Sequence, residues 1–278
     1  MPSILKILYL DLMTDSILKV CLAPIEILWG RKDDNLKALQ KIFDKIHPET
    51  DLLVLPETFS TGFPSDLDKE AFRRLAERNT GETIDLIKKY SAKNSLAVAG
   101  SFIADSGGLL FNRAFFIEPS GDEYFADKRH LFSLGGEDQI LRAGDSRMLL
   151  RYRGWNISMI VCYDLRFPTW CRNRNNEYDL LLAVANWPVK RIDTWDTLLK
   201  ARAIENQAFV CGVNCRGIDN KNAEYNGSSH MFDYRGKDIA VNISDDGLLY
   251  ASLSMQKLIN YRDKFPFWKD ADNFYLEI

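Results

Sequence analysis

Three residues of types that suit amide chemistry each stand at or just beyond the end of a segment that reads as a strand. Glu57 follows "LLVLP", Lys128 follows "EYFAD" and Cys162 follows "SMIV". In α/β proteins catalytic side chains gather at strand ends, because the strands are rigid and the loops give access. The three positions therefore raise the question of whether these side chains meet in one site.

A cysteine, a glutamate and a lysine together provide what amide hydrolysis needs. A free thiol has a pKa near 8.5 and is mostly protonated at neutral pH, so a nearby carboxylate is needed as general base. A lysine ammonium favours the thiolate and stabilises an oxyanion, and the backbone N–H of Tyr163 is a second candidate donor to that oxyanion. This chemistry predicts Cys162 as nucleophile, Glu57 as base and Lys128 as electrostatic partner.

Taken singly, each of these residues also has an ordinary structural interpretation. A cysteine at the end of a strand usually packs as a core thiol. A glutamate after a proline is usually a cap or a surface residue, and a lysine in "ADKRHLF" is usually solvated. The positions alone leave both interpretations open.

The elements that must position these residues alternate along the chain. Apolar runs and helical spacing predict strands at 17–23, 51–57, 95–103, 111–119, 178–188 and 208–217, and helices at 33–46, 68–79, 83–94 and 194–207. Residues 145–161 predict a hairpin whose turn contains the glycine of "RGW". This order implies an α/β fold of layered sheets with helices outside.

Composition excludes several classes of protein. The 278 residues carry a formal charge of −3 with both signs interspersed, which argues against a nucleic-acid-binding surface. The sequence has no apolar run long enough to predict a membrane span. The five cysteines are odd in number and irregularly spaced, which favours a reduced, cytoplasmic setting. The three histidines lie far apart and no CxxC pair is present, so we expect no metal site.

The N-terminal residues precede the first well-formed strand. We expect residues 1–16 to be an N-terminal extension outside the domain and residues 17–278 to form one domain. An extra edge strand or a loose tail is the alternative for the extension.

The sequence motifs around the three candidate residues carry more information than the positions of those residues. They resemble the three signature segments of the nitrilase superfamily, the carbon-nitrogen hydrolases, in that family's order: "LPETFSTGF" (55–63), "DKRHLFSLGGED" (127–138) and "VCYDLRFPTWCRN" (161–173). The segments "YDLLLAVANWP", "RAIENQAFVCGVNCRG" and "YRDKFPFWKDADNF" resemble the omega-amidase branch. The resemblance runs from about residue 17 to the C-terminus.

This resemblance implies a four-layer αββα sandwich. It implies the roles given above for Glu57, Lys128 and Cys162, and a second glutamate after the lysine motif, placed at Glu137. It also implies a homodimer or higher homo-oligomer, a small-molecule amide as substrate, and no cofactor.

A substrate with a carboxylate beside a ketone calls for a cationic anchor, preferably a bidentate one. Arg166 is the first candidate, with a buried structural ion pair as its alternative. Lys190 and Arg191 are weaker candidates, because both could be a solvated helix start. The remaining candidates for the pocket are Tyr163, Asn186, Trp187 and Phe59, with Phe132 beside them, although isolated aromatic residues more often serve packing. His130 is interpreted as structural.

The leading hypothesis is an omega-amidase that hydrolyses the side-chain amide of 2-oxo acids such as 2-oxoglutaramate and 2-oxosuccinamate. A nitrile hydrolase, a carbamoyl-amide hydrolase or a deaminated-glutathione amidase of the same superfamily is the alternative. A catalytically idle dimeric scaffold is a third hypothesis, although the three catalytic residues and Glu137 are all present.

Overall fold

The computed structural model describes residues 15–63, 69–242 and 247–276. Most of the proposed N-terminal extension, residues 1–14, lies outside the described residues. Within them Asp15 accepts a hydrogen bond from the Ser254 hydroxyl at 2.6 Å, next to the start of the first strand. The boundary at residue 16 stays a prediction.

Two sheets form the centre of the fold. The first has the order β13-β14-β1-β2-β3-β4-β5. Its strands are β1 (Ile17–Leu22), β2 (Leu52–Val54), β3 (Ala97–Ser106), β4 (Leu109–Ile117), β5 (Glu123–Asp127), β13 (Val241–Asn242) and β14 (Leu249–Ser254). The pairs β1–β2 and β2–β3 are parallel and the other pairs are antiparallel.

The second sheet has the order β12-β9-β8-β7-β6. Its strands are β6 (Met148–Tyr152), β7 (Trp155–Val161), β8 (Leu180–Ala185), β9 (Phe209–Asn214) and β12 (His230–Phe232). The expected hairpin is β6–β7, and its two-residue turn at Arg153 and Gly154 has positive φ at both positions, as a type I′ turn requires.

A buried apolar layer lies between the two sheets. Val20, Val54 and Phe116 of the first sheet belong to one cluster with Ile157 and Leu182 of the second. Strand side chains alternate between two faces, so each sheet turns one face to this layer and the other to helices.

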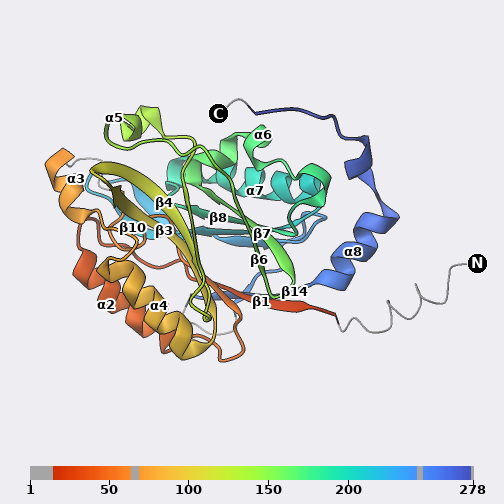
Figure 1. Ribbon diagram of the computed structural model, residues 1–278, viewed down its shortest axis with the longest axis horizontal. Coiled ribbons are helices and arrows are strands. Elements are labelled where there is room, and N and C mark those ends of the chain that lie inside the picture. Colours follow the sequence, from red (N-terminus) through yellow and green to blue (C-terminus); the bar gives the residue numbers. More distant parts are fainter. Residues whose placement is uncertain (1–14, 64–68, 243–246, 277–278) are drawn as a thin grey trace, which may run out of the picture.

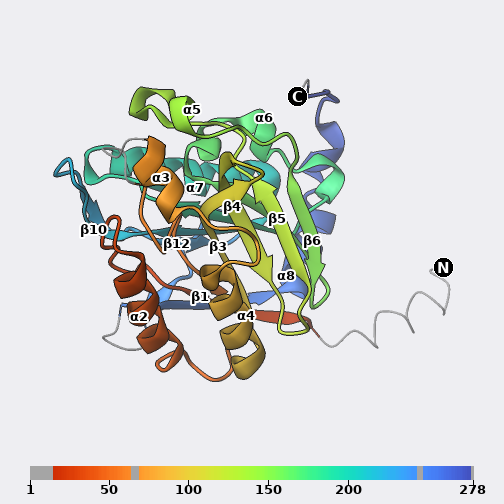
Figure 2. The same cartoon turned by 60° about the vertical axis from the view of Figure 1, so that its left-hand side comes forward.

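Helices cover both outer faces, as Figures 1 and 2 show. On the first sheet lie α2 (Lys32–Phe43) and α4 (Glu82–Asn94), whose buried residues recur at helical spacing; Phe43 and Tyr90 stack with ring centroids 4.3 Å apart. On the second lie α6 (Pro168–Cys171) and α7 (Ile192–Asn206). The expected αββα sandwich is therefore confirmed.

Smaller elements complete the described chain. They are α3 (Lys69–Leu75), α5 (Glu137–Ile140), α8 (Met255–Lys264), the hairpin β10–β11 (Arg216–Ile218 and Glu224–Asn226), and the 3-10 turns η1 (Ser133–Gly135), η2 (Cys162–Arg166), η3 (Arg174–Asn176), η4 (Val189–Arg191) and η5 (Phe267–Asp270). The segment 208–217, expected as one strand, is divided between β9 and β10, which belong to different sheets. Among the described residues no helix has the length and apolar character needed to cross a bilayer.

Candidate active site

The three candidate catalytic residues come from both sheets. Glu57 follows β2 and Lys128 follows β5 in the first sheet, whereas Cys162 follows β7 in the second. All three line one cavity of about 520 Å³. Glu57 and Lys128, 71 positions apart in the sequence, are brought together within the first sheet. The packing of the second sheet on the first adds Cys162 to them.

A buried cluster of one lysine and two glutamates forms part of the lining of this cavity. The Lys128 ammonium lies 3.1 Å from Glu57 Oε1 and 2.8 Å from Glu137 Oε2, and each of the three side chains is at most 4% exposed. Burial opposes the charge on Lys128, but Glu137 and Glu57 outweigh it and raise its pKa well above the ordinary value. Lys128 is therefore a permanent cation at neutral pH.

Glu137 occupies the position expected from the motif and is held from several sides. Besides Lys128, its Oε2 accepts the backbone N–H of Phe132 at 2.6 Å. Burial raises the pKa of the Glu137 carboxyl, the Lys128 charge opposes this, and the Glu57 charge adds to it.

Asn112 is a part of the site that sequence reasoning missed. Its amide donates to Glu57 Oε1 at 2.7 Å and to Glu137 Oε1 at 3.3 Å, and the residue is fully buried. A signal for it exists in the sequence: Asn112 is in phase with Ala114 and Phe116, which face the layer between the sheets. A polar residue on a strand face otherwise directed at the core needs a buried partner.

Asn186, expected beside the pocket, also orients the Glu57 carboxylate. Its backbone N–H donates to Glu57 Oε2 at 2.8 Å and its side-chain amide donates to the Thr58 hydroxyl at 2.9 Å. Each carboxylate oxygen of Glu57 thus has a fixed donor within the protein, which holds the carboxylate in one orientation.

Cys162 lies in a sharp turn between β7 and η2. Its φ of 46° is in the left-handed region, which a residue with a Cβ seldom adopts. Asp164 supports the turn by accepting the backbone N–H of Val161 at 3.1 Å and that of His130 at 2.8 Å. The turn is thereby tied to the segment that carries Lys128, and His130 contributes its ring nitrogen to the same carboxylate at 2.8 Å.

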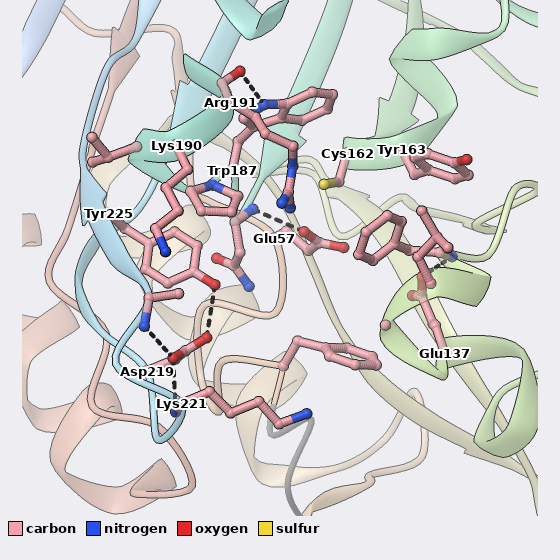
Figure 3. Close-up of a pocket in the computed structure, with 18 of the residues that line it drawn as sticks. Glu57, Glu137, Cys162, Tyr163, Trp187, Lys190, Arg191, Asp219, Lys221 and Tyr225 are labelled. Atoms are coloured by element: carbon pink, nitrogen blue, oxygen red, sulfur yellow. Dashed lines mark hydrogen bonds between the residues drawn. The ribbon is translucent and has the colours of Figure 1, made fainter.

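The surroundings of Cys162 favour the neutral thiol. Burial and the negative charge of Glu57 raise the pKa of Cys162 well above the ordinary value, while Lys128 opposes the shift. The Glu57 carboxylate lines the same cavity as the thiol, and Figure 3 shows the two side chains directed toward one another. The arrangement therefore pairs a protonated thiol with a base that can accept its proton during attack.

The cavity contains every candidate site residue except one. It is lined by Glu57, Lys128, Glu137, Cys162, Tyr163, Arg166, Asn186 and Trp187, together with Phe132, Lys190 and Arg191. The expectation for Phe59 is wrong: its side chain is fully buried in the core between the first sheet and its helices, edge-on to Phe115 at 6.0 Å. Its position close to Glu57 in sequence did not reveal that its side chain is directed away from the cavity.

Arg166 is half-buried in the cavity wall, with its guanidinium carbon 5.1 Å from the centre of a Trp187 ring. Within the described residues no carboxylate lies within ion-pair distance of it, so the structural ion pair considered as its alternative is not found there. Trp187 is 3% exposed and serves both wall and core, since it also packs against Trp195 at 5.5 Å.

Metal ions in proteins are bound by clusters of several ligating side chains. No group of three or more histidine, cysteine, aspartate or glutamate residues that could hold a metal ion is present in the ranges the structure describes.

Comparisons with known proteins identify the family of this chain. The model of the carbon-nitrogen hydrolase family matches residues 20–263. The chain is 39% identical over 260 residues to the omega-amidase YafV of Escherichia coli K12, covering 93% of this chain and 98% of that protein. It is 32% identical to the 2-oxoglutaramate amidase of Bacillus subtilis, covering 88% and 94%.

A solved structure shows the same fold. XC1258 from Xanthomonas campestris, described as a CN-hydrolase superfamily protein with an arsenic adduct in its active site, superposes with a TM-score of 0.88 at 35% identity, covering 95% of this chain and all of that one. Since both the family model and relatives above 30% identity span most of the sequence, this chain belongs to the carbon-nitrogen hydrolase family.

Proposed function

We propose that this protein is an omega-amidase, which hydrolyses the terminal amide of short 2-oxo dicarboxylic acid monoamides to the acid and ammonia. The observation that carries the proposal is the meeting of Cys162 with the ion-paired Glu57 and Lys128 in the lining of one cavity, which Arg166 also lines. The names of the relatives, omega-amidase and 2-oxoglutaramate amidase, support the same substrate class.

The proposed first half-reaction is acylation of Cys162. Glu57 removes the thiol proton as the sulfur attacks the amide carbon, which forms a C–S bond and an oxyanion. The Lys128 ammonium and the backbone N–H of Tyr163 stabilise that oxyanion. Collapse of the tetrahedral intermediate breaks the C–N bond, Glu57 passes the proton to the leaving nitrogen, and ammonia departs from a thioester.

The second half-reaction is hydrolysis of the thioester. Glu57 removes a proton from water as its oxygen attacks the acyl carbon, and returns that proton to the sulfur when the C–S bond breaks. Lys128 stays charged throughout because Glu137 and Glu57 hold its pKa high. Glu137 positions Lys128 in both halves.

The proposed anchor for the substrate carboxylate is Arg166. Its guanidinium lies in the wall of the same cavity as Cys162 and stacks on Trp187. A planar fork of N–H donors suits a carboxylate in two-point contact. Asn186 and Trp187 would line the space between this anchor and the sulfur.

Ammonia release from a substrate panel tests the proposal: 2-oxoglutaramate, 2-oxosuccinamate, glutamine, an aliphatic amide and an aliphatic nitrile. We expect a strong preference for the two oxo-acid amides. Activity confined to the nitrile or the neutral amide would overturn the substrate assignment and favour another hydrolase of the superfamily.

A second measurement tests the intermediate. Hydroxylamine should convert the thioester to a hydroxamate during turnover, and Cys162→Ala should abolish both ammonia and hydroxamate. Cys211→Ala is the matched control, because Cys211 is a fully buried thiol of β9 outside the cavity lining. Normal turnover by Cys162→Ala would refute the mechanism.

A homodimer in a reducing, cytoplasmic compartment is part of the proposal. All five cysteines are free thiols, which is consistent with such a compartment. Light scattering on the purified protein tests the dimer.

A further inference from the structure

Arg191, at the end of η4, projects into the active-site cavity from the wall opposite the nucleophile. Figure 3 shows its side chain extending from the rim toward Cys162 and Glu57. The guanidinium carbon lies 5.5 Å from the centre of the Phe132 ring, and both residues line the cavity. The Arg191 side chain thus carries a positive charge into the part of the cavity that contains Cys162 and Glu57.

The backbone of Arg191 is fixed, although its side chain is exposed to the cavity. The indole N–H of Trp187 donates to the Arg191 carbonyl at 2.8 Å, and the Arg191 N–H donates to the Pro188 carbonyl at 3.0 Å. Trp187 is itself held by its own backbone N–H, which donates to Asn214 Oδ1 at 2.7 Å. The tight turn "NWPVKR" therefore delivers the arginine side chain from a rigid base.

Several arginines among the described residues form an ion pair with a carboxylate, and Arg191 is not one of them. Ion pairs hold the guanidinium groups of Arg113, Arg147 and Arg262 against Asp127, Glu177 and Asp179. In residues 15–63, 69–242 and 247–276, no carboxylate lies within 4.0 Å of the Arg191 or Arg166 guanidinium. Both arginines line the cavity, and both contact Trp187. The Arg166 guanidinium lies over the Trp187 ring, and the backbone carbonyl of Arg191 accepts the Trp187 indole N–H.

We propose that Arg191 is a specificity-determining residue that binds the carboxylate end of the substrate together with Arg166. The inference rests on the proposed function, which it deepens: two guanidinium forks suit a carboxylate with an oxo group beside it, a head group with acceptors in two directions. A neutral amide lacks that head group and gains nothing from Arg191.

The test uses Arg191→Gln, which removes the charge and the fork, and Arg191→Lys, which keeps the charge alone. Binding of 2-oxoglutarate, the expected product, is measured by calorimetry, and kcat and KM are measured on 2-oxoglutaramate and on an aliphatic amide. Arg151→Gln is the matched control, because Arg151 is exposed on β6 and outside the cavity lining.

A hydrogen bond to a charged group contributes enough to predict about a 10- to 100-fold loss in Arg191→Gln. We expect that loss in 2-oxoglutarate binding and in KM for 2-oxoglutaramate, with kcat changed much less and kcat/KM for the aliphatic amide within about twofold. Arg191→Lys should recover only part of the loss, and Arg151→Gln should match the wild type.

Several results would overturn the assignment. Unchanged 2-oxoglutarate binding in Arg191→Gln, or no binding of 2-oxoglutarate to the wild type, would each do so. An equal fall on both substrates would instead mark Arg191 as a support for the Phe132 loop. If Arg191→Gln loses 2-oxoglutarate while the wild type releases no ammonia from oxo-acid amides, the carboxylate site stands and the proposed activity fails.

Discussion

Replacing Lys128 by methionine tests how the buried cluster is held together. The substitution keeps an unbranched apolar stem and removes the only cation that contacts Glu57 and Glu137 among the described residues. Two carboxylates then remain in a site with at most 4% side-chain exposure, with the Asn112 amide as a shared neutral donor. Breaking a buried ion pair from one side costs about 3–5 kcal/mol. This is a large share of the roughly 5–15 kcal/mol of stability typical of a folded domain.

The pH dependence of this loss gives the sharper test. In the wild type the pKa of Lys128 is raised, so its contribution to stability is complete below the unfolded lysine pKa of about 10.4 and constant from pH 5 to 8. In Lys128→Met the folded carboxylate pair retains a proton that unfolded glutamates, with a pKa of about 4.3, have released. The folded variant therefore binds more protons, and its stability falls by up to about 1.4 kcal/mol per pH unit as pH rises.

Urea unfolding at pH 5, 6, 7 and 8 measures this slope. Lys37→Met is the matched control, since Lys37 is exposed on α2 and should show little change at any pH. We expect turnover by Lys128→Met to fall at least about a hundredfold at every pH, because the oxyanion loses its charged partner. A destabilisation below about 1 kcal/mol that does not vary with pH would refute the reasoning, since it would mean that the carboxylates are solvated.

Two further predictions concern polar groups other than the three candidate catalytic residues. Asn112→Leu keeps the side-chain volume but removes two buried donors to carboxylates, so we expect a loss of about 2–4 kcal/mol in unfolding free energy; an unchanged urea midpoint would contradict it. His230 lies between Asp238 at 2.6 Å and Asp196 at 3.1 Å, and although burial opposes its charge, the two carboxylates raise its pKa. The contribution of His230 to folding stability is therefore complete below the unfolded histidine pKa of about 6.5 and is lost as pH rises through the folded pKa. His230→Gln should lower the unfolding free energy by about 1 kcal/mol at pH 6 and by progressively less above it. A difference in melting temperature between the two proteins that stays constant from pH 6 to 9 would contradict this.

Local sequence determined the parts of this protein that depend on neighbouring residues. Helical spacing predicted α2 and α4, and the glycine of "RGW" predicted the turn of the β6–β7 hairpin. Apolar runs predicted the strands that end near Glu57 and Cys162, with boundaries off by a few residues because strand ends depend on the partner strand. The three motifs led to the family that the comparisons show.

Tertiary structure decided which of those residues meet. The two-residue period of a strand fixed the face on which Asn112 lies, but not that Glu57 and Glu137 stand opposite that face. Proximity in sequence to Glu57 made Phe59 a candidate, yet its side chain packs in the core on the helix side of the sheet. The sequence favours Arg166 over Arg191 as an anchor, whereas in the folded protein the turn after Asn186 directs the Arg191 side chain into the same cavity. The physical reason is that residue periodicity is local, whereas the contacts of the site cross two sheets and depend on strand order and on the packing of one sheet against the other.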